Sequence, residues 1–444
     1  MRLAASQRRA LGLYTLLWRL LAPLAVLRLL WRSRHDQAYR SRLGERFGRY
    51  RQPPPPPPGP RLWLHAVSLG ETRAAAPLLD ALRREVPQLQ LLLTHTTPTG
   101  RAAGAELLRP GDLQAWLPYD LPAAVERFLQ AFRPQVGVLM ETEIWPNLAQ
   151  ACAGHRVALL LANARLSARS WARWARWPGL ATAAFGALAG AAAQTGADAS
   201  RLRDLGAPGV MVAGNLKFDR RGDAALRMLG RQWRAAAGGR PVLVLASTRE
   251  HRATAEEQLL LDSLPPQLLE RALLVLVPRH LERVGQLVQL LEQRGLRYRL
   301  RSQGEPDAQL QVWVGDSLGE MPAYYAMADA AFIGGSLLPL GGQNLIEACA
   351  EGCAVVIGPH VFNFTHAVEQ AGRAGALAQA ADAGQVWAQL QRWLDDAGAL
   401  RDARRAAREF SAAHRGAAQA QAHWIAGYLR QAAGSPGRPA PTPQ

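Results

Sequence analysis

Short apolar runs alternate with helical stretches along the chain, and this alternation restricts the fold more than any other feature of the sequence. Up to residue 220, the apolar runs predict strands at 62–67, 89–94, 136–140, 157–162 and 210–212. Apolar residues at helical spacing lie between them, at 71–84, 98–108 and 123–132. Such alternation is typical of a parallel sheet with helices on both faces.

The same alternation begins again after a charged stretch at 219–223. It predicts helices at 281–294 and 344–350, and strands at 241–246, 273–277, 311–314, 330–333 and 354–357. Because a single core stops growing at about 250–300 residues, a chain of 444 residues is expected to form two domains. We therefore predict an α/β protein with two doubly wound, Rossmann-like domains, 61–220 and 221–432, that face a central cleft. The Pro- and Gly-rich residues 433–444 are expected to be a disordered tail.

The N-terminal region has an apolar segment, 11–31, that Arg19, Pro23 and Arg28 interrupt. No signal-peptide cleavage site follows it, and an arginine at the bilayer centre costs about 2.5–3.5 kcal/mol. We expect residues 1–52 to be a membrane-associated helical segment with its Trp and Arg side chains at head-group level. A helix that packs on the protein's own core is the alternative. The proline-rich residues 53–60 are expected to be a stiff linker, with a ligand for a proline-binding domain as the alternative.

The chain is strongly basic, with 52 Lys and Arg against 35 Asp and Glu and a formal charge of +17. This charge implies an anionic partner, which is a nucleic acid, a phospholipid surface or a phosphorylated substrate. A non-enzymatic basic protein that binds membrane or nucleic acid is an alternative. A nucleic-acid binder would interleave basic and aromatic residues for stacking, so we expect no nucleic acid as a partner. The three cysteines have no metal-ligand spacing and are expected to be small buried residues in a reducing compartment.

Polar residues follow the predicted strands of the first half, where parallel sheets bind their ligands. Glu71 opens a helix after the first strand, either as a residue favoured by the helix dipole or as a functional carboxylate. Glu141 and Glu143 follow strand 136–140, and period-two spacing would place them on one side with one pKa raised. They are otherwise residues that cap the next helix. Lys217 follows strand 210–212, where it either contacts a phosphate or carboxylate or is solvated.

The strand ends of the second half suit a phosphate. Ser247 with Thr248, and Arg279 with His280, follow two strands, and arginine offers a planar set of donors. The glycine-rich segment 334–347 runs into a helix whose dipole and N–H groups favour an anion, and Glu347 is placed to accept hydrogen bonds from ribose hydroxyls. Neither the dinucleotide-binding glycine pattern nor a P-loop is present.

Ten ordered motifs together resemble those of 3-deoxy-D-manno-octulosonic acid (Kdo) transferases, over residues 10 to 430. They are HAVSLGE (65–71), THTTPTG (94–100), ETEIWPN (141–147), NARLS (163–167), GNLKFD (214–219), AST (246–248), PRH (278–280), GDSLGEMPAYYAMAD (315–329), GGSLLPLGGQNLIE (334–347) and GPHVFNF (358–364). The resemblance implies a GT-B fold and transfer of Kdo from CMP-Kdo to the lipid A precursor lipid IVA, without a metal or cofactor. The implied location is the cytoplasmic face of the inner membrane, with anionic lipid as a partner.

The resemblance also implies roles for individual residues. Glu71 matches the general base, and Glu141 and Lys217 match residues that stabilise the transition state, so inversion at the anomeric carbon is expected. The residues expected to bind the donor are Ser247, Pro278, Arg279, Gly319, Glu320, Met321, Asn344, Leu345, Ile346 and Glu347. Gln343 and Arg249 depart from the family pattern, because the family usually has a histidine at each of these two positions. A GT-B transferase with another donor, such as a UDP-sugar, is the alternative.

Overall fold

The computed structural model describes residues 3–34, 36–50, 55, 59–219 and 223–434. These residues form two compact units: the first contains the described residues of 1–220 and 415–444, and the second those of 221–414. Most of the expected linker at 53–60, the expected domain boundary at 220–222 and most of the expected tail lie outside the described residues.

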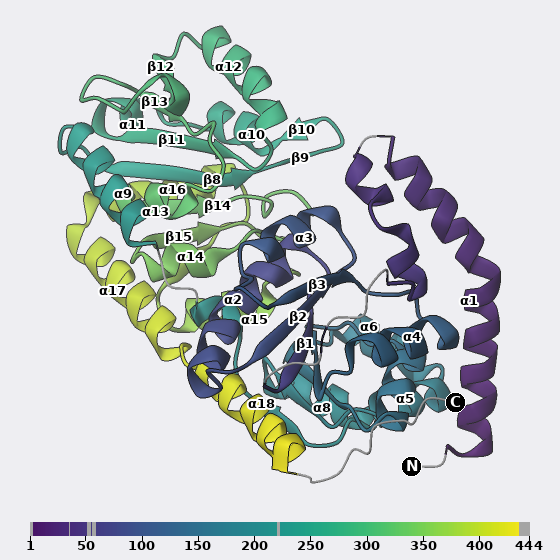
Figure 1. The fold of residues 1–444 in the computed structure, drawn as a ribbon. Coiled ribbons are helices and arrows are strands. Elements are labelled where there is room, and N and C mark those ends of the chain that lie inside the picture. Colours follow the sequence, from purple (N-terminus) through teal and green to yellow (C-terminus); the bar gives the residue numbers. More distant parts are fainter. Residues whose placement is uncertain (1–2, 35, 51–54, 56–58, 220–222, 435–444) are drawn as a thin grey trace. The chain divides into compact units, whose positions relative to one another are not determined.

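The first unit is built on a seven-stranded parallel sheet in the order β3-β2-β1-β4-β5-β6-β7, of which Figure 1 labels β1, β2 and β3. Its strands are β1 (Arg61–His65), β2 (Gln90–His95), β3 (Leu113–Trp116), β4 (Val136–Met140), β5 (Ala158–Ala164), β6 (Gly190–Ala193) and β7 (Val210–Val212). Its helices are α1 (Ala5–Arg32), α2 (Leu69–Glu85), α3 (Pro98–Ala105), α4 (Pro122–Phe132), α5 (Pro146–Gly154), α6 (Ala168–Ala175), α7 (Pro178–Phe185), α8 (Gly196–Asp204) and α18 (Ala417–Gly434). Since β1 and β4 are neighbours, the strand order reverses between them, which is where doubly wound sheets bind ligands.

Both faces of this sheet are buried, as the continuous apolar strands predict. Alternate side chains of β1 enter different cores: Trp63 joins the core under α4, α5, α7 and α8, whereas Leu62 and Leu64 join the core under α2 and α18. Strands β3 and β6 were not predicted. The sequence of β6 is only glycine and alanine, which have little intrinsic strand preference, and pairing with β5 and β7 makes it a strand.

The C-terminal helix α18 belongs to the first unit, whereas the sequence assigned it to the second domain at 221–432. It lies beside α2 (Figure 1) and buries Ala422, Ile425 and Leu429 against the face of β4 and β5. Helix α2 covers only part of this face, so a second helix is needed to remove the remaining apolar side chains from water. That need depends on packing between distant segments, which periodicity does not reveal.

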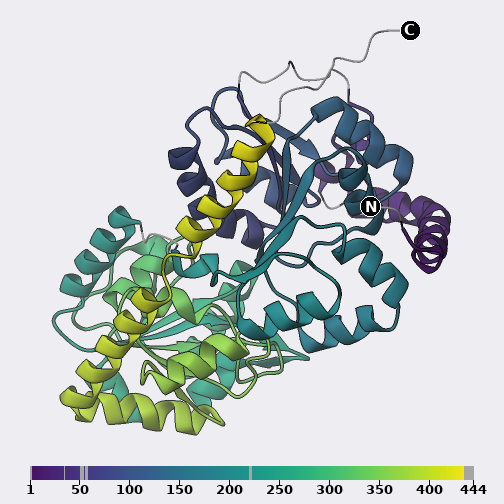
Figure 2. The same cartoon turned by 90° about the horizontal axis from the view of Figure 1, so that it is seen from below.

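Helix α1 lies at the edge of the first unit, where Figure 2 shows it end-on. The side that faces the unit is polar and aromatic: Thr15 Oγ1 donates to Asn147 Oδ1 at 2.9 Å, and Trp18 Nε1 donates to the Tyr14 hydroxyl at 2.7 Å. No residue of α1 is buried. Helix α1 therefore packs against α7 and α5 along one side and leaves most of its leucines exposed on the other.

The second unit also contains a seven-stranded parallel sheet, in the order β12-β13-β11-β8-β14-β15-β16. Its strands are β8 (Val242–Thr248), β11 (Leu273–Pro278), β12 (Tyr298–Leu300), β13 (Val312–Val314), β14 (Ala330–Ile333), β15 (Ala354–Ile357) and β16 (Leu377–Gln379), with a small antiparallel pair, β9 (Glu250–His251) and β10 (Thr254–Ala255). Its helices are α9 (Ala224–Ala236), α10 (Glu256–Asp262), α11 (Pro266–Arg271), α12 (Val284–Gln293), α13 (Met321–Met327), α14 (Leu345–Ala350), α15 (Thr365–Arg373), α16 (Ala383–Asp395) and α17 (Ala397–Ala413). The predicted pair of doubly wound sheets is thus confirmed.

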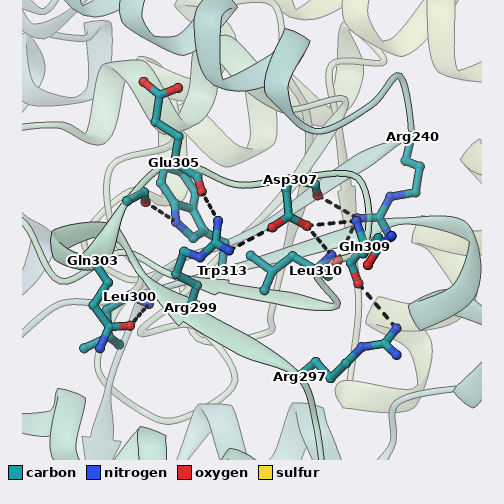
Figure 3. A network of polar contacts seen from close by, with 11 residues as sticks. Arg240, Arg297, Arg299, Leu300, Gln303, Glu305, Asp307, Gln309, Leu310 and Trp313 are labelled. Carbon is teal, nitrogen blue, oxygen red and sulfur yellow. Dashed lines mark hydrogen bonds and ion pairs between the residues drawn. The ribbon is translucent and has the colours of Figure 1, made fainter.

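Several arginines of the second unit stabilise its own loops, as Figure 3 shows for the connection between β12 and β13. Arg240 donates to the carbonyl of Leu310 at 2.6 Å, and Arg299 donates to the carbonyl of Glu305 at 2.7 Å. Arg299 also forms an ion pair with Asp307 at 2.9 Å. Part of the large positive charge therefore has an internal structural use, and only the remainder is available to an anionic partner.

Candidate functional site

Glu71 lies in the first turn of α2, directly after β1, at the point where the strand order of the first sheet reverses. The backbone N–H of Val67 donates to Glu71 Oε2 at 2.8 Å, and the Ser68 hydroxyl donates to Oε1 at 3.0 Å. Ser68 is also the N-cap of α2 and accepts from the Glu71 N–H at 3.4 Å. These contacts fix the carboxylate in one orientation, as a reciprocal cap of the helix would.

Burial raises the pKa of Glu71 from 4.5 to about 7, and the neighbouring negative charges of Glu141 and Glu143 add to this shift. The hydrogen bonds from Val67 and Ser68 act in the opposite direction, because they stabilise the charged form. A carboxylate with this pKa is a stronger base than an ordinary one, and its pKa lies close to neutral pH, where a general base is most effective.

The segment that holds Glu71 is itself fixed by the loop after β2. Thr97, the N-cap of α3, accepts from the Gly100 N–H at 3.2 Å, and its hydroxyl donates to the Val67 carbonyl at 2.8 Å. A Cβ on Gly100 would lie 2.9 Å from the Val67 carbonyl oxygen, so the close approach of these two motifs requires glycine. Thr97 thus holds the carbonyl of Val67, the residue whose N–H binds the Glu71 carboxylate.

Glu141 and Lys217 are close together, although 75 residues separate them in the sequence. Glu141 Oε1 lies 4.0 Å from Lys217 Nζ. Glu141 has a left-handed backbone conformation with φ of 58°, uncommon for a residue with a side chain. Strand β4 ends there, so the period-two spacing expected to place Glu141 and Glu143 on one side does not apply. Burial raises the pKa of Glu143, with a smaller contribution from Glu141.

Asn163 at the end of β5 explains how Lys217 reaches this position. Its side-chain oxygen accepts from the Leu216 N–H at 3.1 Å, and its own N–H donates to Gln421 of α18 at 2.8 Å. Asn163 is fully buried and has a φ of 50°. These bonds bring the chain after the edge strand β7 back to the centre of the sheet, where Glu141 lies.

The residues expected to bind the donor follow four neighbouring strands of the second sheet, β13, β11, β8 and β14. Ser247 has a φ of 54° at the end of β8, and the Arg279 N–H donates to the Thr248 carbonyl at 2.9 Å. Asn344 is the N-cap of α14 and accepts from the Ile346 N–H at 3.1 Å. The exposed guanidinium of Arg279 is accessible to a ligand.

Some of the predicted donor residues have side chains that are committed inside the unit. Leu345 and Ile346 are buried in the core, so only their backbone groups can face a ligand. Glu320, the N-cap of α13, pairs with Arg301 at 3.2 Å and also accepts from the Ser317 hydroxyl. Gly319 has a φ of 85°, a conformation that suits glycine. Because glycine has no side chain, a ligand can approach the backbone closely just before α13.

The glycine-rich loop differs from the expectation that its N–H groups favour a bound anion. The carboxylate of Glu256 accepts from the N–H groups of Gly335, Ser336 and Leu337. An internal anion therefore occupies these donors. The sequence offers no signal for this contact, because Glu256 lies about 80 residues earlier in a charged helix start.

The two departures from the family pattern lie next to each other. A Cβ on Gly335 would lie 3.4 Å from Cδ of Arg249 and 3.3 Å from Nε2 of Gln343. The two side chains therefore meet at the same glycine, although they come from different loops.

In the part of the chain that the structure describes, no group of three or more His, Cys, Asp or Glu residues is arranged to hold a metal ion.

Comparison with known proteins identifies the family. A sequence model described as 3-Deoxy-D-manno-octulosonic-acid transferase (kdotransferase) matches residues 41–220. The 3-deoxy-D-manno-octulosonic acid transferase of Bordetella pertussis is 44% identical over 425 residues, which cover 91% of this chain and 96% of that protein. The chain belongs to the Kdo transferase family. The corresponding transferase of Haemophilus influenzae is 34% identical over 79% of this chain and 82% of its own length.

Solved structures support the fold of this Kdo transferase. A glycosyltransferase from Rickettsia africae has a TM-score of 0.56 at 10% identity, covering 84% of this chain and 99% of that chain. A Staphylococcus aureus MnaA structure with UDP has a TM-score of 0.55 at 14% identity, covering 84% of this chain and 97% of its own. At such low identity the likeness concerns the fold alone, and it confirms the predicted GT-B architecture.

Several residues of this transferase that hold others in place were not predicted from the sequence. Thr97 and Asn163 lie within the motifs shared with the family, so the motifs pointed to these two positions but did not indicate what the residues do. Glu256 had no signal, and neither did Asp120, a buried carboxylate that accepts from the N–H groups of Asn147 and Leu148 at the start of α5. Their partners come from distant segments, and only the fold brings them together.

Proposed function

We propose that this Kdo transferase moves Kdo from CMP-Kdo to a hydroxyl of a lipid A precursor, with Glu71 as the general base. The observation that carries the proposal is the Glu71 carboxylate, which has a pKa of about 7 and is oriented by Val67 and Ser68 at the reversal point of the first sheet. A sugar hydroxyl attacks efficiently only when a base takes its proton in the transition state. The attack needs no covalent enzyme intermediate, so the anomeric carbon is inverted.

Glu141 and Lys217 are proposed to stabilise the transition state. Lys217 is a cation beside a carboxylate 4.0 Å away, and this pairing holds its ammonium near the end of β4. A fixed cation can stabilise negative charge that develops during transfer without reorganisation at the moment of reaction. Glu141 then acts mainly through its effect on Lys217 and on the pKa of Glu71.

The second unit is proposed to bind the CMP part of the donor. Arg279 offers an exposed guanidinium, which suits the phosphate of the leaving CMP. The backbone around Gly319 and Met321, Ser247 and Pro278 at strand ends, and Asn344 to Glu347 are proposed to contact the nucleotide. Gln343 and Arg249, which replace histidines, adjoin this region at Gly335.

Helix α1 is proposed to associate the enzyme with the cytoplasmic face of the inner membrane, where the acceptor lies. Among the described residues it is the one helix that is long and apolar enough to cross a membrane. It exposes Leu13, Leu16, Leu17, Leu20, Leu21, Leu24, Leu27 and Trp31. Exposed apolar side chains, together with the exposed Arg19 and Arg28 of the same helix, suit contact with a membrane of anionic lipid.

The direct test is incubation of the full-length enzyme with CMP-Kdo and lipid IVA, followed by mass spectrometry of the lipid and quantification of the nucleotide. The expected result is a lipid heavier by one or more Kdo residues, with one CMP released for each. Release of UDP from a UDP-sugar, without transfer from CMP-Kdo, would contradict the proposed donor. Kdo transfer to another acceptor in preference to lipid IVA would contradict the proposed acceptor.

A further inference from the structure

Glu256 is a fully buried carboxylate that the proposed mechanism does not use. It is the first residue of α10, directly after the β9–β10 pair. Its Oε1 accepts from the N–H groups of Ser336 and Leu337, both at 2.9 Å. Its Oε2 accepts from the N–H groups of Gly335 at 2.6 Å and Arg249 at 2.9 Å.

These four donors belong to two separate loops. Arg249 follows β8 and lies two residues after Ser247, whereas Gly335, Ser336 and Leu337 follow β14. The link to the first loop is reciprocal, because the Glu256 N–H donates to the Arg249 carbonyl at 3.0 Å. One carboxylate thus connects the ends of two neighbouring strands. The first loop directly follows Ser247 at the end of β8, and the second leads to Asn344, and both residues are proposed to bind the donor.

The connection continues from the glycine loop to the helix that follows it. The Gly342 N–H donates to the Gly335 carbonyl at 2.7 Å, which fixes the chain two residues before Asn344. Ser336 accepts from the Gly358 N–H through its hydroxyl at 2.8 Å and from the His360 N–H through its carbonyl at 2.9 Å. The position of the start of α14 therefore depends on the segment that Glu256 holds.

The chemistry of this contact favours a carboxylate over any neutral residue. Burying a charge is costly unless hydrogen bonds replace its hydration, and four charge-assisted N–H bonds do so here. Without the carboxylate, four backbone donors would lose their acceptor in a buried region. A glutamine offers one oxygen as acceptor and presents an NH₂ group to N–H donors on the other side, so it cannot satisfy them all.

We propose that Glu256 is a positioning residue of the donor subsite, which holds the loop after β8 and the loop after β14 in the relative position that binds the nucleotide. The inference rests on the proposed function, because it assigns a task to these loops in binding CMP-Kdo. It goes beyond that function because it names a buried residue, Glu256, that affects donor affinity through the two loops it holds.

The test compares Glu256→Gln with Glu256→Asp and with Asp329→Asn in the full-length enzyme. Asp329 is a matched control: it is a buried carboxylate of the same sheet that accepts from the Val242 N–H at 2.8 Å and pairs with Arg404, at the opposite ends of β8 and β14. Calorimetry measures CMP binding, steady-state kinetics measures kcat and KM for each substrate, and hydrogen exchange measures protection of residues 334–343.

We expect Glu256→Gln to weaken CMP binding and to lower kcat/KM for CMP-Kdo by up to about 10²-fold, as small misplacements of binding groups do. The KM of the acceptor should not change, exchange in 334–343 should become faster, and Glu256→Asp should give an intermediate result. Asp329→Asn should bind CMP like the wild type, even at an equal loss of thermal stability.

Wild-type CMP affinity in a folded Glu256→Gln variant would overturn the inference. If that variant does not fold, the Asp variant decides, and wild-type CMP affinity there has the same meaning. A wild-type enzyme that fails to bind CMP at all would instead contradict the proposed donor. In that case, hydrogen exchange of 334–343 still tests whether Glu256 holds the loop, so the two failures are distinguishable.

Discussion

The ammonium of Lys217 lies 4.0 Å from the carboxylate of Glu141, although the two residues are far apart in the sequence. Asn163 makes this possible, since it binds the backbone of Leu216 and redirects the chain toward the end of β4. The pair is partly exposed, with 28% of the Lys217 side chain and 24% of the Glu141 side chain accessible. The ion pair contributes little to stability at such exposure, so the proposed role of the pair in the transition state can be tested without a large loss of stability.

Lys217→Ala should therefore lower kcat by about 10²-fold, the usual cost of removing one group that stabilises a transition state. Glu141→Ala should also lower kcat, because the lysine loses the partner that orients it. The double variant should be no slower than the worse single variant, since residues in contact are not independent. Steady-state kinetics at saturating substrates measures all three, and strictly multiplicative effects would contradict a coupled pair.

The pH dependence follows from the raised pKa of Glu71. A general base must be ionised, so kcat/KM should rise with pH through about 7 and level off above it. If the carboxylate were exposed and had its ordinary pKa, the midpoint of the pH–rate profile would instead lie near pH 4.5. A pH–rate profile with buffers of constant ionic strength measures the midpoint, and a flat profile between pH 5 and 8 would contradict the assignment.

The same shift predicts an effect on stability. The folded protein binds the Glu71 proton more tightly than the unfolded chain, so this contribution to the free energy of unfolding is present below pH 4.5 and is lost as the pH rises to about 7. Glu71→Gln cannot ionise. Its Tm relative to the wild type should therefore be more favourable at pH 8 than at pH 4, and calorimetric scans showing an equal Tm difference at both would contradict the shift.

Thr97 offers a test of support at a distance from substrate. Thr97→Val removes the hydroxyl that donates to the Val67 carbonyl. This change should lower kcat, because Val67 orients the Glu71 carboxylate through its N–H. Thr195→Val is a matched control in the same unit, since Thr195 is likewise the N-cap of a helix and its hydroxyl bonds to Asp198 of that same helix. Each variant should lose about 1 kcal/mol of stability, and an equal kcat for both would exclude a positioning role for Thr97.

The exposed face of α1 predicts membrane binding that depends on its leucines. The triple variant Leu17→Glu, Leu20→Glu and Leu24→Glu should reduce sedimentation with vesicles of phosphatidylethanolamine and phosphatidylglycerol, because charged residues on this face oppose burial in the acyl region. Met228→Glu, at an equally exposed apolar residue of α9 in the second unit, should sediment like the wild type. Unchanged sedimentation of the triple variant would contradict the membrane contact.

Much of the fold could be predicted because the buried strands are continuous apolar runs. Strands β4, β14 and β15 have the predicted bounds, since each is fully buried and a polar or glycine residue follows its last residue. Strand β6 and helix α18 could not be predicted in the same way. The first has no strand preference of its own, and the second takes its place from an apolar face that distant segments create.

The candidate site was predictable to a smaller extent. Position after a strand indicated Glu71, Glu141 and Lys217 as candidates, and the ordered motifs supplied their roles. The pKa of Glu71 depends on burial, and the pairing of Lys217 depends on a bend set by Asn163, so neither is visible in local spacing. The contacts of Glu256 were the least accessible, because its four donors come from two loops.

Kdo transfer by Glu71→Gln tests the central claim most directly. Glutamine has nearly the same shape but cannot accept a proton at neutral pH, so the base is removed with little change in volume. The account predicts no transfer of Kdo to lipid IVA above background in a single-turnover assay read by mass spectrometry, while CMP binds to the variant with wild-type affinity. Near-normal turnover in the folded variant would contradict Glu71 as the general base.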